Sequence, residues 1–108
     1  MKYKAIICDL DGTLLNEHHT ISEETKETIR KVVNSGVKFI IATGRHHNDA
    51  ITFKNMLDLD SFLITSNGAK VHDYNNKEII SHNIPVHLSK ELLNYNYSEN
   101  LHKNVYLD

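Results

Sequence analysis

The amino-acid sequence predicts an α/β fold: a Rossmann-like, open and mostly parallel sheet. Three short apolar runs have the length of buried strands, and the two segments between them carry apolar residues at helical spacing. Short connections between such segments are typical of right-handed crossovers within one sheet. The 108 residues, 40% hydrophobic and 24% charged, amount to one globular domain at most.

The predicted elements follow in the order strand, helix, strand, helix, strand, hairpin and a weaker helix. Continuous apolar runs, rather than alternating ones, indicate strands covered on both faces by helices. Ser22 is a candidate N-cap of the first helix, and Gly36 stands where a helix C-terminal glycine belongs. The ranges are strand 3–10, helix 21–36, strand 37–43, helix 44–59, strand 61–68, hairpin 69–84, helix 88–95 and a last strand at 105–107.

Composition and charge exclude several classes of partner. The net charge is −2, and the 12 basic residues form no stripe of the kind that nucleic-acid binding needs. No apolar run approaches the ~20 residues of a membrane span. Cys8 is the single cysteine, so we expect no internal disulfide, a buried thiol and a cytoplasmic protein.

Two carboxylates interrupt the first apolar run, "AIICDLDGTLL". One interpretation is a tight hairpin turn at Asp11-Gly12, with the carboxylates merely capping the turn. The other places Asp9 at the carboxyl end of the first strand and Asp11 two residues on, both directed at one small volume. Like charges that close require a bound cation or a proton, which predicts a metal or acid/base site.

The next two strands also end in polar residues suited to an anion. "ATGR" places Thr43, Gly44 and Arg45 after the second strand, and "TSNG" places Ser66, Asn67 and Gly68 after the third. In an open α/β sheet, ligands bind beyond the carboxyl ends of the strands. A hydroxyl, flexible glycines and the amide groups that open a helix fit a phosphoryl group. Arg45 has two interpretations, a phosphate ligand or the ion-pair partner of a nearby carboxylate.

The three motifs "DLDGTLL", "IIATGR" and "LITSNGA" resemble the haloacid dehalogenase (HAD) superfamily, most closely its Cof-type sugar-phosphate phosphatases. The resemblance implies a Mg²⁺-dependent hydrolase of small phosphorylated metabolites. Asp9 resembles the nucleophile that forms an aspartyl-phosphate, and Asp11 resembles the general acid/base. Both would bind Mg²⁺. The residues implied to bind phosphate or substrate are Leu10, Gly12, Thr43, Gly44, Arg45, Asn67 and Gly68.

The resemblance also implies a division of the chain. Residues 1–85 match the N-terminal part of the HAD-like core, and residues 86–108 match the beginning of a cap domain. The lysine of the third family motif and the acidic pair of the fourth do not occur here, so we expect a fragment with weak phosphatase activity or none. In the family's sheet the first strand is central, so its outer edge should be uncovered, which favours self-association.

Two other function classes remain open at this point. The first is a non-catalytic phosphate-binding or interaction module that pairs through its sheet edge. The second is a domain whose carboxylates have no ligand. Eight histidines include two adjacent pairs, His18-His19 and His46-His47. Because adjacent side chains point in different directions, we expect solvated loop residues rather than a metal site. A role facing the substrate stays open for both pairs.

Overall fold

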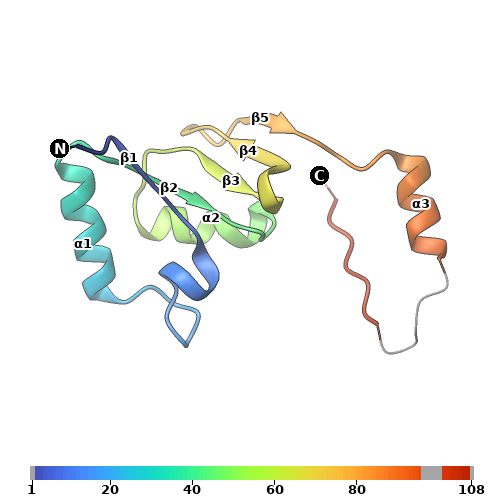
Figure 1. Cartoon of the computed structure of the whole chain (residues 1–108), viewed down its shortest axis with the longest axis horizontal. Coiled ribbons are helices and arrows are strands. Elements are labelled where there is room, and N and C mark those ends of the chain that lie inside the picture. The colour runs from blue at the N-terminus through green and yellow to red at the C-terminus, as the bar shows by residue number, and fades with distance from the viewer. Residues whose placement is uncertain (1, 96–100, 108) are drawn as a thin grey trace.

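Five strands form one mixed sheet in the computed structural model, which describes residues 2–95 and 101–107 (Figure 1). The strands lie side by side in chain order. β1, β2 and β3 run parallel, and β4 and β5 continue the sheet antiparallel. This confirms the predicted open α/β sheet and the hairpin that follows it. The bounds are β1 Ala5–Cys8, β2 Lys38–Ala42, β3 Leu63–Thr65, β4 Lys70–His72 and β5 Glu78–Ser81.

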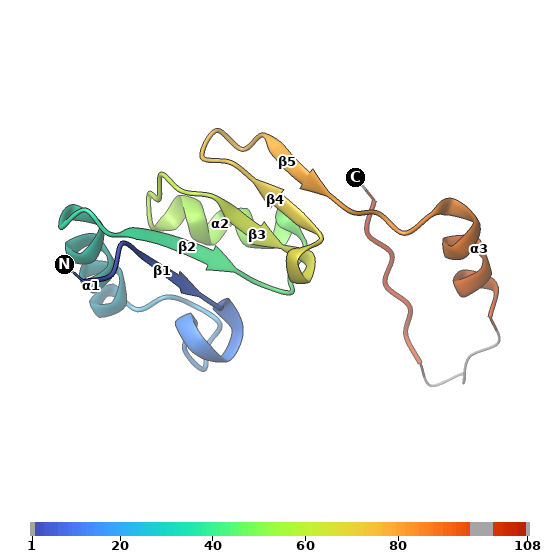
Figure 2. The same cartoon turned by 45° about the horizontal axis from the view of Figure 1, so that its top comes forward.

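Two helices cover one face of this sheet, α1 Glu23–Asn34 and α2 His47–Met56 (Figures 1 and 2). The predicted N-cap of α1 is confirmed, because the Ser22 hydroxyl accepts the Thr25 N–H at 3.2 Å. The α2 N-cap is His46, whose ring nitrogen Nδ1 accepts the Asn48 N–H at 3.3 Å. The start of α2 therefore lies directly after the Thr43–Arg45 loop.

The hydrophobic core lies between these helices and the sheet. Strand side chains that point toward the helices are buried, while their neighbours in sequence point to the other face. Cys8 packs partly buried against this core, and burial, with a smaller effect from Asp9, raises the pKa of its thiol. The buried cluster comprises Leu10, Leu15, Ile21, Ile29, Phe39, Ile41, Ala50, Leu59 and Leu63.

The opposite face of the sheet and the outer edge of β1 are uncovered by the described residues. Ile7 on β1 is 62% exposed and its register partner on β2 is Ile40, while Ile64, Val71 and Ile80 are partners across β3, β4 and β5. The expectation that β1 is covered on both faces is wrong, and the expectation of an uncovered edge is confirmed. An apolar run indicates that a strand suits burial, but it does not indicate which segment covers that strand.

The C-terminal part begins with helix α3 Val86–Asn94, which lies away from the sheet (Figure 1). This helix confirms the prediction for 88–95 to within two residues. The prediction of a strand at 105–107 is wrong, because these residues pair with no strand of the sheet. Instead the ring of Tyr106 stacks on His46 at a centroid distance of 4.9 Å. Across the described residues, no helix is both long and apolar enough to cross a bilayer.

Candidate active site

The loop after β1 carries the first pair of predicted site residues. Asp9 follows the strand directly, and its Oδ1 accepts the Leu10 N–H at 2.8 Å. The chain then makes a tight turn, Leu10–Leu14, which the Leu15 N–H closes on the Leu10 carbonyl at 2.9 Å and in which Gly12 has a φ of 76°. The hairpin-turn interpretation is therefore wrong, since no strand returns from this loop. The fully buried side chain of Leu10 anchors the turn, so only its backbone is available to the site.

Asp11 is held by Arg45 in a two-pronged ion pair. The Arg45 Nε donates to Asp11 Oδ2 and Nη2 donates to Oδ1, both at 2.7 Å. Of the two interpretations of Arg45, the carboxylate pairing is the one observed. The hydrogen bond from Arg45, more than its charge or the weaker effect of His19, holds the pKa of Asp11 below its usual value. Asp11 is therefore ionised at neutral pH in this arrangement.

The loops after β2 and β3 are tied to each other through their backbones. The Ser66 N–H donates to the Arg45 carbonyl at 2.9 Å, and the Asn67 N–H donates to the Thr43 carbonyl at 3.2 Å. Within the first of these loops, the Thr43 hydroxyl oxygen accepts the Arg45 N–H at 3.1 Å. Asn67 has a φ of 55°, a left-handed conformation that asparagine tolerates better than most residues. The two loops thus form one bonded unit.

A pocket of about 290 Å³ lies at this edge of the sheet. It brings together five of the nine predicted site residues, whereas Leu10, Asp11, Gly12 and Arg45 are outside its lining. Two further lining residues, Ala42 and Ile64, were not predicted from sequence. They are register partners: Ala42 is the last residue of β2 and Ile64 lies one residue before the end of β3, so their only signal was this position near the strand ends. The lining is Asp9, Ala42, Thr43, Gly44, Ile64, Asn67 and Gly68.

Gly44 and Asn67 meet closely across this pocket. A Cβ atom on residue 44 would lie 2.8 Å from the Asn67 Oδ1, below ordinary contact distance. Residue 44 does not have a positive φ, so the requirement for glycine here is steric. The pocket therefore depends on the absence of a side chain at position 44.

The oxygen donors near the pocket suit Mg²⁺ better than a transition metal. Within the described residues, no group of three or more histidine, cysteine, aspartate or glutamate side chains could hold a metal by itself. Mg²⁺ commonly takes only one or two carboxylates and completes its octahedral shell with water and substrate phosphate. Asp9 on the pocket wall is one such carboxylate, whereas both carboxylate oxygens of Asp11 accept hydrogen bonds from Arg45.

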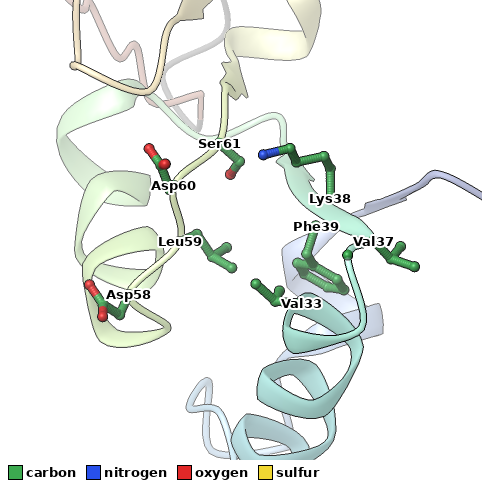
Figure 3. Close-up of a pocket in the computed structure, with 9 residues that line it drawn as sticks. Val33, Val37, Lys38, Phe39, Asp58, Leu59, Asp60 and Ser61 are labelled. Carbon is green, nitrogen blue, oxygen red and sulfur yellow. The ribbon is translucent and has the colours of Figure 1, made fainter.

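A second hollow, of about 220 Å³, lies at the other end of the strands (Figure 3). Val33, Phe39 and Leu59 form its apolar lining, and Lys38 comes from the beginning of β2. Figure 3 shows the carboxylates of Asp58 and Asp60 pointing away from the cavity. This hollow does not contain the predicted phosphate-binding residues, and it faces away from the carboxyl ends of β2 and β3.

The histidine pairs differ from one another in their surroundings. His18 and His19 are exposed, as predicted, and His19 Nδ1 lies 3.9 Å from Asp11 Oδ1. His46 caps α2. The prediction of a solvated loop residue is wrong for His47, which is partly buried on the first turn of α2 and stacks on His72. Its burial depends on β4, which the local sequence around residue 47 does not reveal.

Comparisons with known proteins agree with this fold. A relative from Buchnera aphidicola is 48% identical over 91 residues, which are 84% of this chain and 34% of that protein. A Bacillus subtilis 5-amino-6-(5-phospho-D-ribitylamino)uracil phosphatase is 38% identical over 106 residues, 97% of this chain and 36% of that protein. The chain thus spans about a third of the length of the relatives it matches.

A solved structure and a family match complete the comparison. The crystal structure of a haloacid dehalogenase-like hydrolase from Bacteroides thetaiotaomicron superposes with a TM-score of 0.79 and 27% identity, over 85% of this chain and 36% of that one. Residues 6–108 match the haloacid dehalogenase-like hydrolases as a family. Together with the pocket that Asp9 shares with the loops after β2 and β3, this match shows that the chain belongs to the haloacid dehalogenase-like hydrolase family.

Proposed function

We propose that this chain supplies the nucleophile and the phosphate pocket of a Mg²⁺-dependent phosphatase of small phosphorylated metabolites. The observation that carries the proposal is the shared pocket, which Asp9 lines together with Thr43, Gly44, Asn67 and Gly68. A carboxylate beside a hydroxyl and loop amides is suited to attack a phosphoryl group that those donors hold. The Bacillus subtilis relative is named for a phosphorylated small molecule, which supports this substrate class.

The proposed reaction has two steps on phosphorus. An Asp9 carboxylate oxygen attacks phosphorus, the bond from phosphorus to the ester oxygen breaks, and the leaving oxygen takes a proton from Asp11. The product is an aspartyl-phosphate and an alcohol. Asp11 then accepts a proton from water, whose oxygen attacks phosphorus and breaks the bond to Asp9. Inorganic phosphate leaves, and both aspartates return to their starting protonation states.

Asp9 through its carboxylate and Asp11 through its backbone carbonyl would hold the Mg²⁺ ion. When bound, the ion offsets the negative charge that keeps a carboxylate away from a phosphate dianion. The Thr43 hydroxyl and the Gly44 N–H would hold the phosphoryl oxygens and orient phosphorus toward Asp9. The N–H groups of Thr43 and Arg45 already donate within the protein. Gly44 leaves room for Asn67 beside them.

The Asp11–Arg45 ion pair suits one of the two steps as it stands. An ionised Asp11 can accept a proton from water, but it cannot donate one to a leaving group. In the first step Asp11 must therefore be protonated, which requires the Arg45 hydrogen bonds to be released. We propose that Arg45 exchanges between Asp11 and the bound phosphate, so that substrate binding removes the hydrogen bonds that keep Asp11 ionised and lets Asp11 take up a proton from solvent before the first step.

The chain by itself is proposed to be an incomplete enzyme. We assign residues 1–85 to the N-terminal part of the core and residues 86–108 to the beginning of a cap, as in Cof-type sugar-phosphate phosphatases. A sugar phosphate or a similar metabolite in the cytoplasm is the proposed substrate. Losing one charge-stabilising group typically costs about 10²–10³ in rate, so we expect slow turnover or none without the lysine and acidic pair.

The proposal is tested by ligand binding to this chain. Beryllofluoride with Mg²⁺ mimics a phosphoryl group on a carboxylate, and a ligand of the native state raises the melting temperature. We expect beryllofluoride and Mg²⁺ together to stabilise the chain by about 2.7 kcal/mol at a hundredfold excess over Kd. Fluoride with Mg²⁺ but without beryllium is the control. An unchanged melting temperature in all mixtures would show that Asp9 and Asp11 only cap a turn.

A second candidate function is an interaction module that pairs through the β1 edge. The observation that favours it is the unpaired edge of β1 next to an apolar face that the described residues leave exposed. With this second function the pocket binds a phosphate group and does not hydrolyse its ester.

Replacing Ile7 with lysine is expected to abolish self-association through this edge. A charge on an exposed edge strand opposes pairing with another strand and costs little stability. Sedimentation velocity at tens of micromolar should give a dimer or larger species for the wild type and a monomer for Ile7→Lys. Ile79→Lys on β5, the other edge strand, is the matched control and should associate as the wild type does. A monomeric wild type would refute edge pairing.

A further inference from the structure

Two histidine rings form a stack between α2 and β4. The rings of His47 and His72 lie 3.7 Å apart at their centroids with an interplanar angle of 25°. The Nδ1 atom of each ring is buried and has no hydrogen-bond partner within the described part of the chain. The reaction proposed above uses neither residue. A neutral ring whose buried nitrogen makes no hydrogen bond costs a modest amount of folding free energy. A charged ring buried without a partner costs much more.

Charged groups surround this stack on three elements. From α2, the ammonium of Lys54 reaches the Asn76 Oδ1 at 3.3 Å and lies on a side chain that is almost fully buried. From β4, Lys70 donates to the Ser81 hydroxyl at 2.7 Å. Glu78 on β5 is a carboxylate close to Lys70 and to the stack, because its Oε2 lies 3.5 Å from the Lys70 Nζ and 3.8 Å from the His72 Nε2.

The stack therefore has little capacity for added positive charge. Glu78 already neutralises part of the charge on Lys70, and the N-cap residue His46 adds a further titratable ring on the same helix. Burial, followed by the effects of His72, His46 and Lys54, lowers the pKa of His47, and Glu78 only partly opposes this. The neutral form of His47 is therefore the stable one at neutral pH.

The position of the stack connects it to the phosphate pocket. His47 begins α2, two residues after Arg45, and His72 ends β4, which starts two residues after Gly68. The stack therefore joins the element that follows the Thr43–Arg45 loop to the element that follows the Ser66–Gly68 loop. These are the same two loops that the Ser66–Arg45 and Asn67–Thr43 backbone hydrogen bonds connect.

We propose that His47 and His72 are positioning residues whose stacked rings hold the two phosphate-binding loops together, and that a proton on His47 loosens the pocket. The binding role of the loops rests on the proposed function, but the stack and its response to protons do not. This effect of a proton on His47 would make the pocket best ordered at neutral pH and less ordered in mild acid.

The direction of the effect on stability follows from the lowered pKa. As pH falls below the ordinary histidine value of 6.5, the unfolded chain takes up a proton before His47 does in the folded chain. Folding stability is therefore full above this pH and declines as pH falls below it. The Asp11–Arg45 pair loses its contribution only at lower pH, as pH falls below 3.8, so the two effects are separable.

The test is an NMR titration of the ligand-free chain from about pH 8 to about pH 5. We expect the ring proton signals of His47 to titrate below pH 6.5 and the amide signals of Gly44 and Gly68 to shift with the same midpoint. His18, with 77% of its side chain exposed, is the internal reference. An ordinary midpoint for His47, or pocket amides that do not follow it, would overturn the proposal.

A variant separates the proton from the packing. Phenylalanine at position 47 keeps a flat ring for stacking and cannot be protonated. We expect His47→Phe to remove most of the fall in melting temperature between about pH 7.5 and about pH 5.5, while His18→Gln retains it. A variant with the wild-type pH dependence would contradict the proposal. If His47→Phe does not fold, the wild-type titration decides alone. Because no phosphate is present, failure of the phosphatase proposal leaves this result intact.

Discussion

Asp9→Asn is expected to abolish the stabilisation by beryllofluoride and Mg²⁺ and to lower any phosphatase turnover by at least about 10³-fold. The amide nitrogen and the neutral oxygen of asparagine cannot attack phosphorus as a carboxylate does, and they bind a divalent cation poorly. The fold should be retained, because the asparagine Oδ1 can still accept the Leu10 N–H that Asp9 accepts at 2.8 Å. The measurements are thermal melts with the ligands and hydrolysis of a generic phosphomonoester.

The control for this substitution is Glu17→Gln, which removes a carboxylate that is 85% exposed and lies outside the pocket lining. It should change neither the ligand response nor the turnover, and its stability should stay within about 0.5 kcal/mol of the wild type. Equal ligand stabilisation of Asp9→Asn and wild type would remove Asp9 from the nucleophile position, even if the phosphate pocket itself were retained.

Gly44→Ala is expected to weaken beryllofluoride binding at least tenfold and to cost about 1–3 kcal/mol in the free energy of unfolding. The added methyl carbon would lie 2.8 Å from the Asn67 Oδ1, so the asparagine side chain must leave its position. Its backbone cannot easily follow, because the Asn67 N–H is bonded to the Thr43 carbonyl. Chemical denaturation and ligand titrations of the variant measure the two effects.

A double-mutant cycle with Asn67→Gly identifies the cause. Glycine at position 67 removes the side chain that the methyl group meets and accepts the left-handed conformation there, φ 55°. In that background Gly44→Ala should cost little stability, which corresponds to a coupling energy of about 0.5–3 kcal/mol. Additive effects of the two substitutions would show that the close approach of these residues does not shape the pocket.

The order of strands and helices was predictable because it depends on local patterns. Apolar runs of strand length, the Ser22 cap and the glycine after the first helix act within a few residues, and each is confirmed in the structure. The strand predicted at 105–107 failed because a strand requires a partner, which no local pattern supplies. The covering of β1 was wrong for the same reason.

The pocket was partly predictable because parallel strands place their carboxyl ends at one edge. We applied that rule to the motifs that resemble the HAD superfamily, and it predicted that five residues lie near each other. All five line the pocket: Asp9, Thr43, Gly44, Asn67 and Gly68. It did not identify Ala42 and Ile64, whose apolar side chains carry no chemical signal of their own.

The sequence by itself determined the fold class, the family and the residues that meet at the strand ends, because short-range periodicity and specific motifs encode them. Only the tertiary structure decided that Asp11 is held by Arg45, 34 positions away, that His47 stacks on His72, and that one face of the sheet is uncovered. These are contacts between segments distant in the chain. Their geometry arises from the packing of α2 against the sheet and from the pairing of β4 within it, which no local sequence pattern contains.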